Sequence, residues 1–181
     1  MTEYLVPYAN AESEFEEKRS RFISHVFLVE SEAEARARID EMKKKYYDAR
    51  HNCWCFVLHD GTVRYGDDGE PQGTAGQPML NVFQRENVEN VVCIVTRYFG
   101  GILLGTGGLV RAYQGSVKLG LEGLPVTLRE DMRRFVVSIE PHQVSDFQHF
   151  LAESRGRVQS SDFRFDATFE VLVPSDEADA F

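Results

Sequence analysis

The sequence predicts a mixed protein of strands and helices in two parts, with the boundary near residues 121–127. An apolar run, a glycine cluster and a helical pattern follow one another over residues 91–120. Thirteen of the fourteen glycines lie between Gly61 and Gly123, so unusual backbone conformations are expected in two loops there. Beyond LEGLPVT, residues 121–127, the glycine-rich pattern stops while strand and helix patterns continue. We therefore expect a linker or a domain edge at this segment.

The first part is expected to open with a hairpin and a helix. Residues 12–29 contain two strand-like stretches around the basic segment KRSR, and the second stretch, FISHVFLV, has the length and aromatic content of a strand. Ser31 with Glu34 matches a capping box and predicts the start of a helix that runs through SEAEARARIDEMKKKYY to Tyr47. Lysines end this helix and complement its dipole, and we interpret them as a solvated face. The expected buried stripe is Ala35, Ile39, Met42 and Tyr46.

A second strand, a turn and an irregular loop follow. CWCFVLH, residues 53–59, predicts a strand, and Asp60-Gly61 predicts a turn into the short strand TVRY. Glycine and proline punctuate residues 66–78, so no regular element is expected there. Because proline is tolerated at the first position of a helix, Pro78 is predicted to begin a helix over PMLNVFQREN.

The central segment, residues 91–120, predicts a buried strand, a glycine loop and a helix. The run VVCIV suits a strand buried on both faces, and apolar residues recur at helical spacing after the loop. A helix start presents unpaired N–H groups to anions, and Arg97 and Arg111 stand on either side of the loop. We therefore predict one positively lined recess for a phosphate-like anion. Its expected residues are Arg97, Gly100, Gly101, Gly105, Gly107, Gly108, Arg111 and Lys118.

The same glycines also have a structural interpretation, in which they serve tight turns and close strand–helix packing. The loop lacks the Gly-Lys-Ser/Thr ending of a nucleotide-binding loop, and its spacing departs from the dinucleotide pattern GxGxxG. Spacing alone leaves both interpretations open.

The loop before the second helix is acidic, with Asp67, Asp68 and Glu70 close together. One interpretation is a divalent-metal site, and another is general acid–base chemistry by a carboxyl whose pKa its neighbours raise. The third, which we prefer, is that the carboxylates bond loop N–H groups or pair with an arginine. We therefore assign no catalytic residue, metal or cofactor. The motif residues of this loop are Asp67, Asp68, Glu70, Gly73, Thr74 and Gly76.

Three cysteines, Cys53, Cys55 and Cys93, are too few and wrongly spaced for a disulfide framework or a structural zinc site. His51, Cys53 and Cys55 would share one face of a strand. Same-face neighbours on a strand lie about 6.6 Å apart, so three of them converge poorly on one ion. Reduced cysteines in the core are the preferred interpretation.

The second part predicts a βαββ pattern. REDMRRFVVSI at residues 129–139 suits a strand, HQVSDFQHFLAES suits a helix, and residues 157–173 suit a hairpin. A split βαβ fold would need a further helix and strand, so we expect either that this domain is incomplete in the sequence or that it is an unusual small domain.

The composition is that of a globular protein, with 43% hydrophobic and 27% charged residues. The formal net charge of −9 opposes nucleic-acid binding by the whole surface, although it leaves room for a local basic patch. No stretch has the length of a membrane span, and the N-terminal residues lack the pattern of a signal peptide. The expected location is the cytoplasm, without membrane contact.

Two motifs carry a resemblance to a known family. Residues 67–80, DDGEPQGTAGQPML, and residues 95–113, VTRYFGGILLGTGGLVRAY, resemble the signatures of the IMPACT/YigZ family of conserved cytoplasmic proteins. RFISH at 21–25, ARHNC at 49–53 and the C-terminal βαββ block fit the same family, so the resemblance covers nearly the whole chain.

The resemblance implies a two-domain α+β protein. Residues 1–123 would form an IMPACT N-terminal-like domain, an α+β sandwich similar to a ribosomal-protein domain and to a domain of elongation factor G. Residues 127–181 would form a ferredoxin-like domain, incomplete here. Eukaryotic members of the family are translation regulators, and bacterial members look like nucleic-acid or ribosome-associated proteins without a settled activity.

Three hypotheses for function follow. The leading one is a non-enzymatic module that binds RNA, the ribosome or a translation-associated protein, with Arg97 and Arg111 on phosphates and Tyr98, Phe99 or Tyr113 stacking on bases. The second is a metal-dependent phosphoester-processing enzyme that uses the acidic loop. The third is a protein-interaction adaptor.

Overall fold

The computed structural model describes residues 3–181, and the chain divides into two compact units. The larger unit comprises Leu5–Leu128, and the smaller comprises Arg129–Phe181 with the start of the described chain. Strands β1 (Glu3–Pro7) and β7 (Val126–Glu130) pair in a two-stranded sheet. Residues 1 and 2, which begin the first predicted domain, lie outside the described residues.

A five-stranded antiparallel sheet forms the centre of the larger unit, in the order β2-β3-β6-β4-β5. The strands are β2 (Ala11–Glu17), β3 (Ser20–Leu28), β4 (His51–Val57), β5 (Val63–Gly66) and β6 (Val91–Tyr98). The register places Arg97 of β6 between Phe22 of β3 and His51 of β4. This register fixes the residues that surround the Arg97 side chain.

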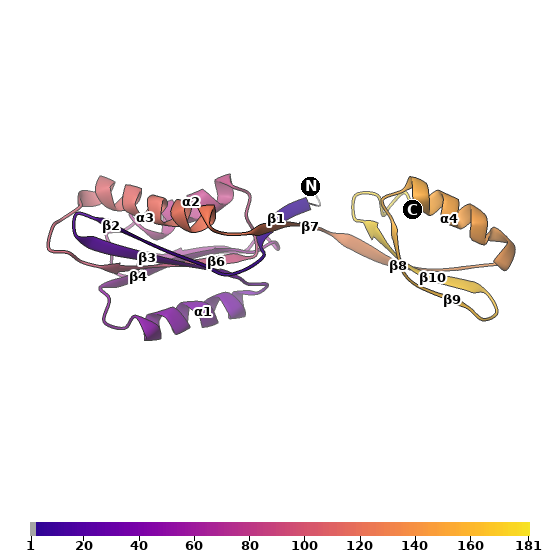
Figure 1. The fold of residues 1–181 in the computed structure, drawn as a ribbon, viewed down its shortest axis with the longest axis horizontal. Coiled ribbons are helices and arrows are strands. Elements are labelled where there is room, and N and C mark those ends of the chain that lie inside the picture. The colour runs from indigo at the N-terminus through magenta and orange to yellow at the C-terminus, as the bar shows by residue number, and fades with distance from the viewer. Residues whose placement is uncertain (1–2) are drawn as a thin grey trace. The chain divides into compact units, whose positions relative to one another are not determined.

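Helices cover both faces of this sheet. Figure 1 shows α1 (Glu32–Lys45) on one face and α2 (Gly76–Arg85) and α3 (Gly105–Glu122) on the other. Ile94 belongs to the core beneath α1, whereas Cys93 and Val95 belong to the core beneath α2 and α3. Every residue of β6 except Tyr98 is buried, which confirms the prediction of a strand covered on both faces.

Local signals explain where the helices begin. Ser31 caps α1 as predicted, because its hydroxyl accepts a hydrogen bond from the Glu34 backbone N–H at 3.2 Å. The Glu34 carboxylate in turn accepts from the Glu30 backbone N–H at 2.9 Å. The second helix begins at Gly76, two residues before the predicted start at Pro78. A side chain from the preceding loop explains this earlier start, as described below.

The smaller unit has the predicted βαββ pattern. Its sheet has the order β8-β10-β9, from β8 (Met132–Ile139), β9 (Arg157–Phe163) and β10 (Ala167–Pro174), with both pairings antiparallel. A short 3₁₀ turn, η1 (Pro141–Gln143), precedes helix α4 (Val144–Glu153). The core forms where Phe147 of α4 packs on Phe169 of β10, with ring centroids 5.1 Å apart.

One predicted strand boundary was wrong. The single strand expected over 129–139 is broken at Asp131, and its first part belongs to β7, which pairs with the unpredicted strand β1. This pairing joins segments far apart in the sequence, so the local sequence does not reveal it. The segment 121–127, expected to be a linker or a domain edge, contains the end of α3 at Glu122 and the start of β7 at Val126, and the two compact units divide just after it, between Leu128 and Arg129.

No helix within residues 3–181 combines the length and the apolar character needed to cross a membrane.

Candidate functional site

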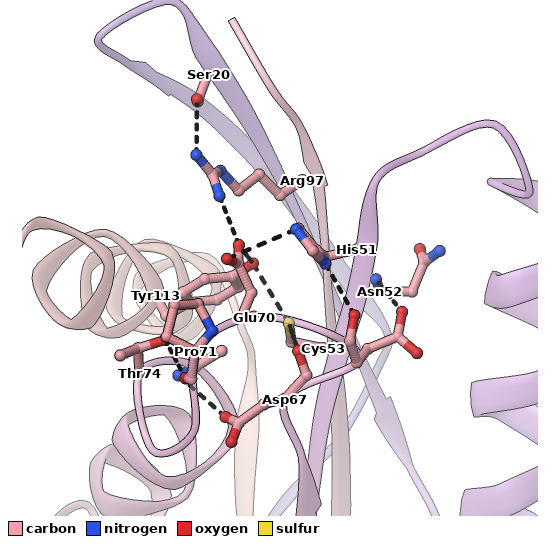
Figure 2. A network of polar contacts seen from close by, with 12 residues as sticks. Ser20, His51, Asn52, Cys53, Asp67, Glu70, Pro71, Thr74, Arg97 and Tyr113 are labelled. Carbon is pink, nitrogen blue, oxygen red and sulfur yellow. Dashed lines mark hydrogen bonds and ion pairs between the residues drawn. The ribbon is translucent and has the colours of Figure 1, made fainter. Parts of the chain in front are cut away.

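The acidic motif loop, the end of β6, the start of β4 and helix α3 meet in one buried polar cluster. Figure 2 shows the side chains of Glu70, Arg97, His51, Tyr113 and Cys53 directed toward one another from these four segments, with Ser20 of β3 beside Arg97. We call this cluster the Glu70 network. Its members are Ser20, His51, Asn52, Cys53, Asp67, Asp68, Glu70, Arg97 and Tyr113.

Glu70 and Arg97 form the ion pair at the centre of the network. Arg97 Nη1 donates to Glu70 Oε1 at 2.7 Å, and the Tyr113 hydroxyl donates to the same oxygen at 2.8 Å. Both charged side chains are buried, with 6% and 3% of their surfaces exposed. Buried charges in proteins are normally paired, since desolvation of an unpaired charge is costly. Glu70 therefore neutralises the arginine that we predicted would contact phosphates.

A hydroxyl and two aromatic rings also contact the Arg97 guanidinium. Its Nη2 donates to the Ser20 hydroxyl at 3.3 Å, and the rings of Phe22 and Phe99 lie 5.7 Å and 5.5 Å from its guanidinium carbon. In the described part of the chain, its third nitrogen, Nε, has no hydrogen-bond partner.

Asp67 explains the early start of α2. Its carboxylate accepts from the backbone N–H groups of Gly73, Ala75 and Gly76, at 2.8, 3.2 and 2.8 Å. These bonds satisfy N–H groups that would otherwise be unpaired at the helix start, and the negative charge suits the positive end of the helix dipole. Asp67 is thus a cap supplied from upstream in the sequence.

Asp68 joins the motif loop to two other elements. Its carboxylate accepts from Lys43 Nζ of α1 at 2.6 Å and from the Asn52 backbone N–H of β4 at 2.7 Å. Its backbone carbonyl accepts from His51 Nδ1 at 2.8 Å, so the Nδ1 atom of that ring carries a proton. The other ring nitrogen, Nε2, then faces Glu70 Oε2 at 3.6 Å, which is longer than a hydrogen bond.

The metal-site interpretation of the acidic loop therefore loses its basis. Each of the three carboxylates is bonded to backbone N–H groups or to a cation, as our preferred interpretation expected. Among residues 3–181, no group of three or more histidine, cysteine or acidic side chains is arranged to hold a metal ion. The three carboxylates do not converge on one point where an ion would be coordinated.

The three cysteines are free and buried, in agreement with the prediction of reduced core residues. The thiol of Cys53 donates to the Asp67 carbonyl at 2.9 Å and lies 3.3 Å from the Tyr113 hydroxyl. Burial raises the pKa of the Cys53 thiol and of the Tyr113 hydroxyl well above their ordinary values. Both groups keep their protons at neutral pH, so they serve the network as hydrogen-bonding groups.

The structure places the two predicted anion-binding arginines at two different recesses. Arg97 lines a recess of about 390 Å³ with Arg50, His51, Glu70 and Gly105, which we call the Arg97 recess. Arg111 lines a recess of about 560 Å³ with Lys18, Gly108 and Lys118, which we call the Arg111 recess. The prediction of one recess shared by both arginines is therefore corrected.

The glycines of the predicted site do not line one common recess. Gly100 packs against the backbone of Arg19, where an added Cβ would lie 1.9 Å from the carbonyl oxygen, so no larger residue fits. Gly101 precedes α3, Gly105 begins it, and Gly107 and Gly108 lie in its first turn. An added Cβ at Gly107 would lie 3.5 Å from Arg111 Nη1. Gly107 and Gly108 therefore belong near the Arg111 recess, and Gly105 to the Arg97 recess.

The motif loop residues Gly73, Thr74 and Gly76 make contacts that hold the loop in place. The Thr74 hydroxyl donates to the Pro71 carbonyl at 2.6 Å, and an added Cβ at Gly76 would lie 2.9 Å from the Gly66 backbone nitrogen. These contacts close the loop against β5 and the start of α2.

Some site residues were not predicted from the sequence. Lys18 at the Arg111 recess comes from the β2–β3 turn, and the basic segment KRSR was the available signal. Tyr113 was expected to be a possible stacking residue, yet its side chain is fully buried beside Glu70. Tyr98 is partly buried and its hydroxyl donates to Asp48 at 2.8 Å, while Phe99 keeps 38% of its surface exposed.

Comparison with known proteins places these loops in a family context. The family described as Impact N-terminal domain matches residues 18–121, which contain both glycine-rich loops and the whole Glu70 network. The chain is 39% identical to IMPACT family member YvyE of Bacillus subtilis over 98% of its own length and 83% of the relative. It is 35% identical to IMPACT family member YigZ of Escherichia coli, over 97% and 88% of the two chains.

A solved structure described as an hypothetical protein has a similar fold. It matches with a TM-score of 0.72 and 33% identity, over 99% of this chain and 89% of the other.

Proposed function

Since this chain belongs to the IMPACT family, we propose that it is a non-enzymatic protein of the cytoplasm that acts in translation by binding structured RNA, free or in the ribosome. The resemblance to translation regulators is the reason for proposing a role in translation. The Arg111 recess is the proposed contact surface for RNA. Phosphates of the RNA are its proposed ligands, because they carry the charge that basic side chains recognise.

One observation carries this proposal: the basic side chains of the Arg111 recess are not neutralised within the protein. Arg111 and Lys118 lie on the exposed side of α3, and Lys18 reaches the same recess from the β2–β3 turn. No ion pair joins any of these three side chains to an acidic residue in the described range 3–181. Basic side chains that stay unpaired in a chain of net charge −9 are suited to an external anion.

The geometry also favours an extended ligand here. Arg111 and Lys118 are two helical turns apart, about 10 Å along the axis, so they can contact separate phosphates of one strand. Glu17 and Glu122 lie at the same recess and make its surface mixed in charge. We expect them to select against non-specific attachment, because a misplaced phosphate would be repelled.

Filter binding of a structured RNA at two salt concentrations tests the proposal. The double variant Arg111→Ala/Lys118→Ala is expected to bind more weakly, and its salt dependence should fall by about one unit of slope for each phosphate that is no longer bound. The matched control is Arg36→Ala/Lys44→Ala, which removes the same charge from α1 on the opposite face of the sheet.

Equal affinity and equal slope for the two double variants would contradict the proposed surface. Capture of partner proteins that survives nuclease treatment and high salt, without RNA binding, would favour the adaptor hypothesis instead.

The finer architecture is part of the same proposal. We take residues 1–123 as an IMPACT N-terminal-like domain related to a domain of elongation factor G, and residues 127–181 as a ferredoxin-like domain. The strand order β8-β10-β9 supports the second assignment, because a split βαβ unit has its third strand between the first two.

A further inference from the structure

We propose that the Arg97 recess is a binding site for a small molecule with an oxyanion head group, either a phosphate or a carboxylate, and an apolar body. This inference goes beyond RNA binding, because it concerns a separate recess and a separate class of ligand. It rests on three features of the recess: the uncapped start of α3, an unpaired buried donor, and a positive charge beside an apolar wall.

The start of α3 provides donors that the protein leaves unused. Leu104 is the N-cap residue, and it has no side-chain oxygen to accept from the first N–H groups of this eighteen-residue helix. No other side chain of the described residues caps the helix start. Gly105 and Thr106 line the recess, so the start of α3 lies at its edge. Such a helix start binds anions through its N–H groups and its dipole. Helix α2 differs in this respect, because the Asp67 carboxylate accepts from N–H groups at its start.

Arg97 provides the second, independent feature. Its side chain lines the same recess and is 94% buried, and its Nε–H finds no acceptor among residues 3–181. Buried donors in native proteins nearly always have a partner, so each exception calls for an acceptor outside the protein. An oxyanion in the recess would be such an acceptor. Glu70 does not fill this role, because its Oε1 accepts from Arg97 Nη1 and from Tyr113 and neither of its oxygens accepts from Arg97 Nε.

The charge of the recess is suited to an anion. Arg50, His51 and Arg97 line it, against one lining carboxylate, that of Glu70. Glu70 is already paired with Arg97, so Arg50 remains as an uncompensated positive charge. The Arg50 guanidinium rests on the Phe99 ring at 5.4 Å, where it is exposed and free to turn toward a ligand.

The recess also has an apolar lining. Phe99, Leu103, Leu104 and Leu109 line it, and 81% of the Leu103 surface is exposed. The volume of about 390 Å³ falls in the range of small-molecule sites, which combine an apolar lining with a few convergent polar groups. The ligand class is therefore a molecule whose head group is charged and whose body is apolar or aromatic.

The test follows nuclear magnetic resonance signals of the ¹⁵N-labelled full chain on addition of four probes. The probes are inorganic phosphate, phenyl phosphate, benzoate and benzyl alcohol. We expect phenyl phosphate or benzoate to shift the amide signals of Gly105 and Thr106 and the Nε–H signal of Arg97. Benzyl alcohol should leave the Arg97 signal unchanged because it lacks the charge. Whichever of phenyl phosphate and benzoate binds more tightly identifies the head group as phosphate or carboxylate.

Variants separate this site from the RNA surface. Arg50→Ala should weaken binding of the anionic probe about tenfold, as expected for loss of one charge-assisted hydrogen bond. Arg64→Ala removes an exposed arginine on β5 outside the recess and should have no effect. Arg111→Ala/Lys118→Ala should bind the probe normally while binding RNA more weakly than the parent.

The proposal is overturned if no probe shifts the Arg97 Nε–H signal, or if sodium chloride at matched ionic strength shifts it equally. It is also overturned if Arg64→Ala and Arg50→Ala weaken probe binding alike.

Discussion

Two arginines flank the same glycine-rich loop, and the fold gives them opposite environments. Arg97, at the end of β6, is 5% exposed and paired with Glu70, whereas Arg111, in α3, is exposed and unpaired within residues 3–181. The difference comes from the element that carries each residue. A central strand has neighbours on both sides, while a helix that packs on a sheet keeps one face in solvent.

This comparison shows what each charge needs. A buried guanidinium needs a carboxylate inside the protein, and the motif loop supplies it as Glu70. An exposed guanidinium needs no internal partner and is available to a ligand. We therefore propose that Arg97 contributes mainly to stability and that Arg111 contributes to binding. Four predictions follow, beginning with the largest expected effect, and the first and the last test this division.

Removal of the buried partner should destabilise the protein most. Glu70→Ala leaves Arg97 buried without a counter-charge, and we expect a loss of about 3–5 kcal/mol in the free energy of unfolding. Urea denaturation followed by circular dichroism measures it. The control is Glu14→Ala, which breaks the exposed pair of Glu14 with Arg21 and should cost much less. Similar losses in the two variants would mean that burial does not distinguish the arginine pairs.

Removal of the upstream cap of α2 should have the second largest effect. Asp67→Ala takes the acceptor from three backbone N–H groups, and we expect a loss of about 2 kcal/mol in unfolding free energy. Asp67→Asn keeps one acceptor oxygen and should lose less. If Asp67→Asn is as unstable as Asp67→Ala, the charge and its interaction with the helix dipole matter more than the number of acceptors.

A buried histidine on the other face of the sheet should make stability depend on pH. Burial lowers the pKa of His25 below its ordinary value of 6.5, against the opposing effect of Glu12, and the nearby Lys45 lowers it further. The ring also packs against Tyr46 and Phe27. Below about pH 6.5 the unfolded chain takes up a proton that the folded chain resists, so stability should fall as the pH decreases toward the folded pKa.

Unfolding in urea at a series of pH values measures this loss, and His25→Gln supplies the control. As the pH is lowered below 6.5, the unfolding free energy of the variant should decrease less than that of the parent. An equal loss would assign the pH dependence to other groups.

The sequence predicted much of the fold and the composition of the site. It did not predict which groups of the site bond one another. Ser31 and Glu34 fixed the start of α1, and the run VVCIV marked the strand buried on both faces, because these signals are local. The pairing of Glu70 with Arg97 depends on the register of three strands, and the capping of Gly76 by Asp67 depends on the path of a loop. Neither leaves a periodic signal. The acidic cluster was therefore recognisable as a motif, while the partner of each carboxylate was not.

The smallest expected effect on stability belongs to the exposed arginine, and it sharpens the comparison most. Arg111→Ala/Lys118→Ala removes two side chains that make no ion pair within the described chain, so its unfolding free energy should stay within about 0.5 kcal/mol of the parent. Urea denaturation on the samples used for RNA binding checks this. A stable variant that binds RNA more weakly would separate the role of Arg111 from that of Arg97. A loss as large as that of Glu70→Ala would show instead that the two arginines both serve the fold.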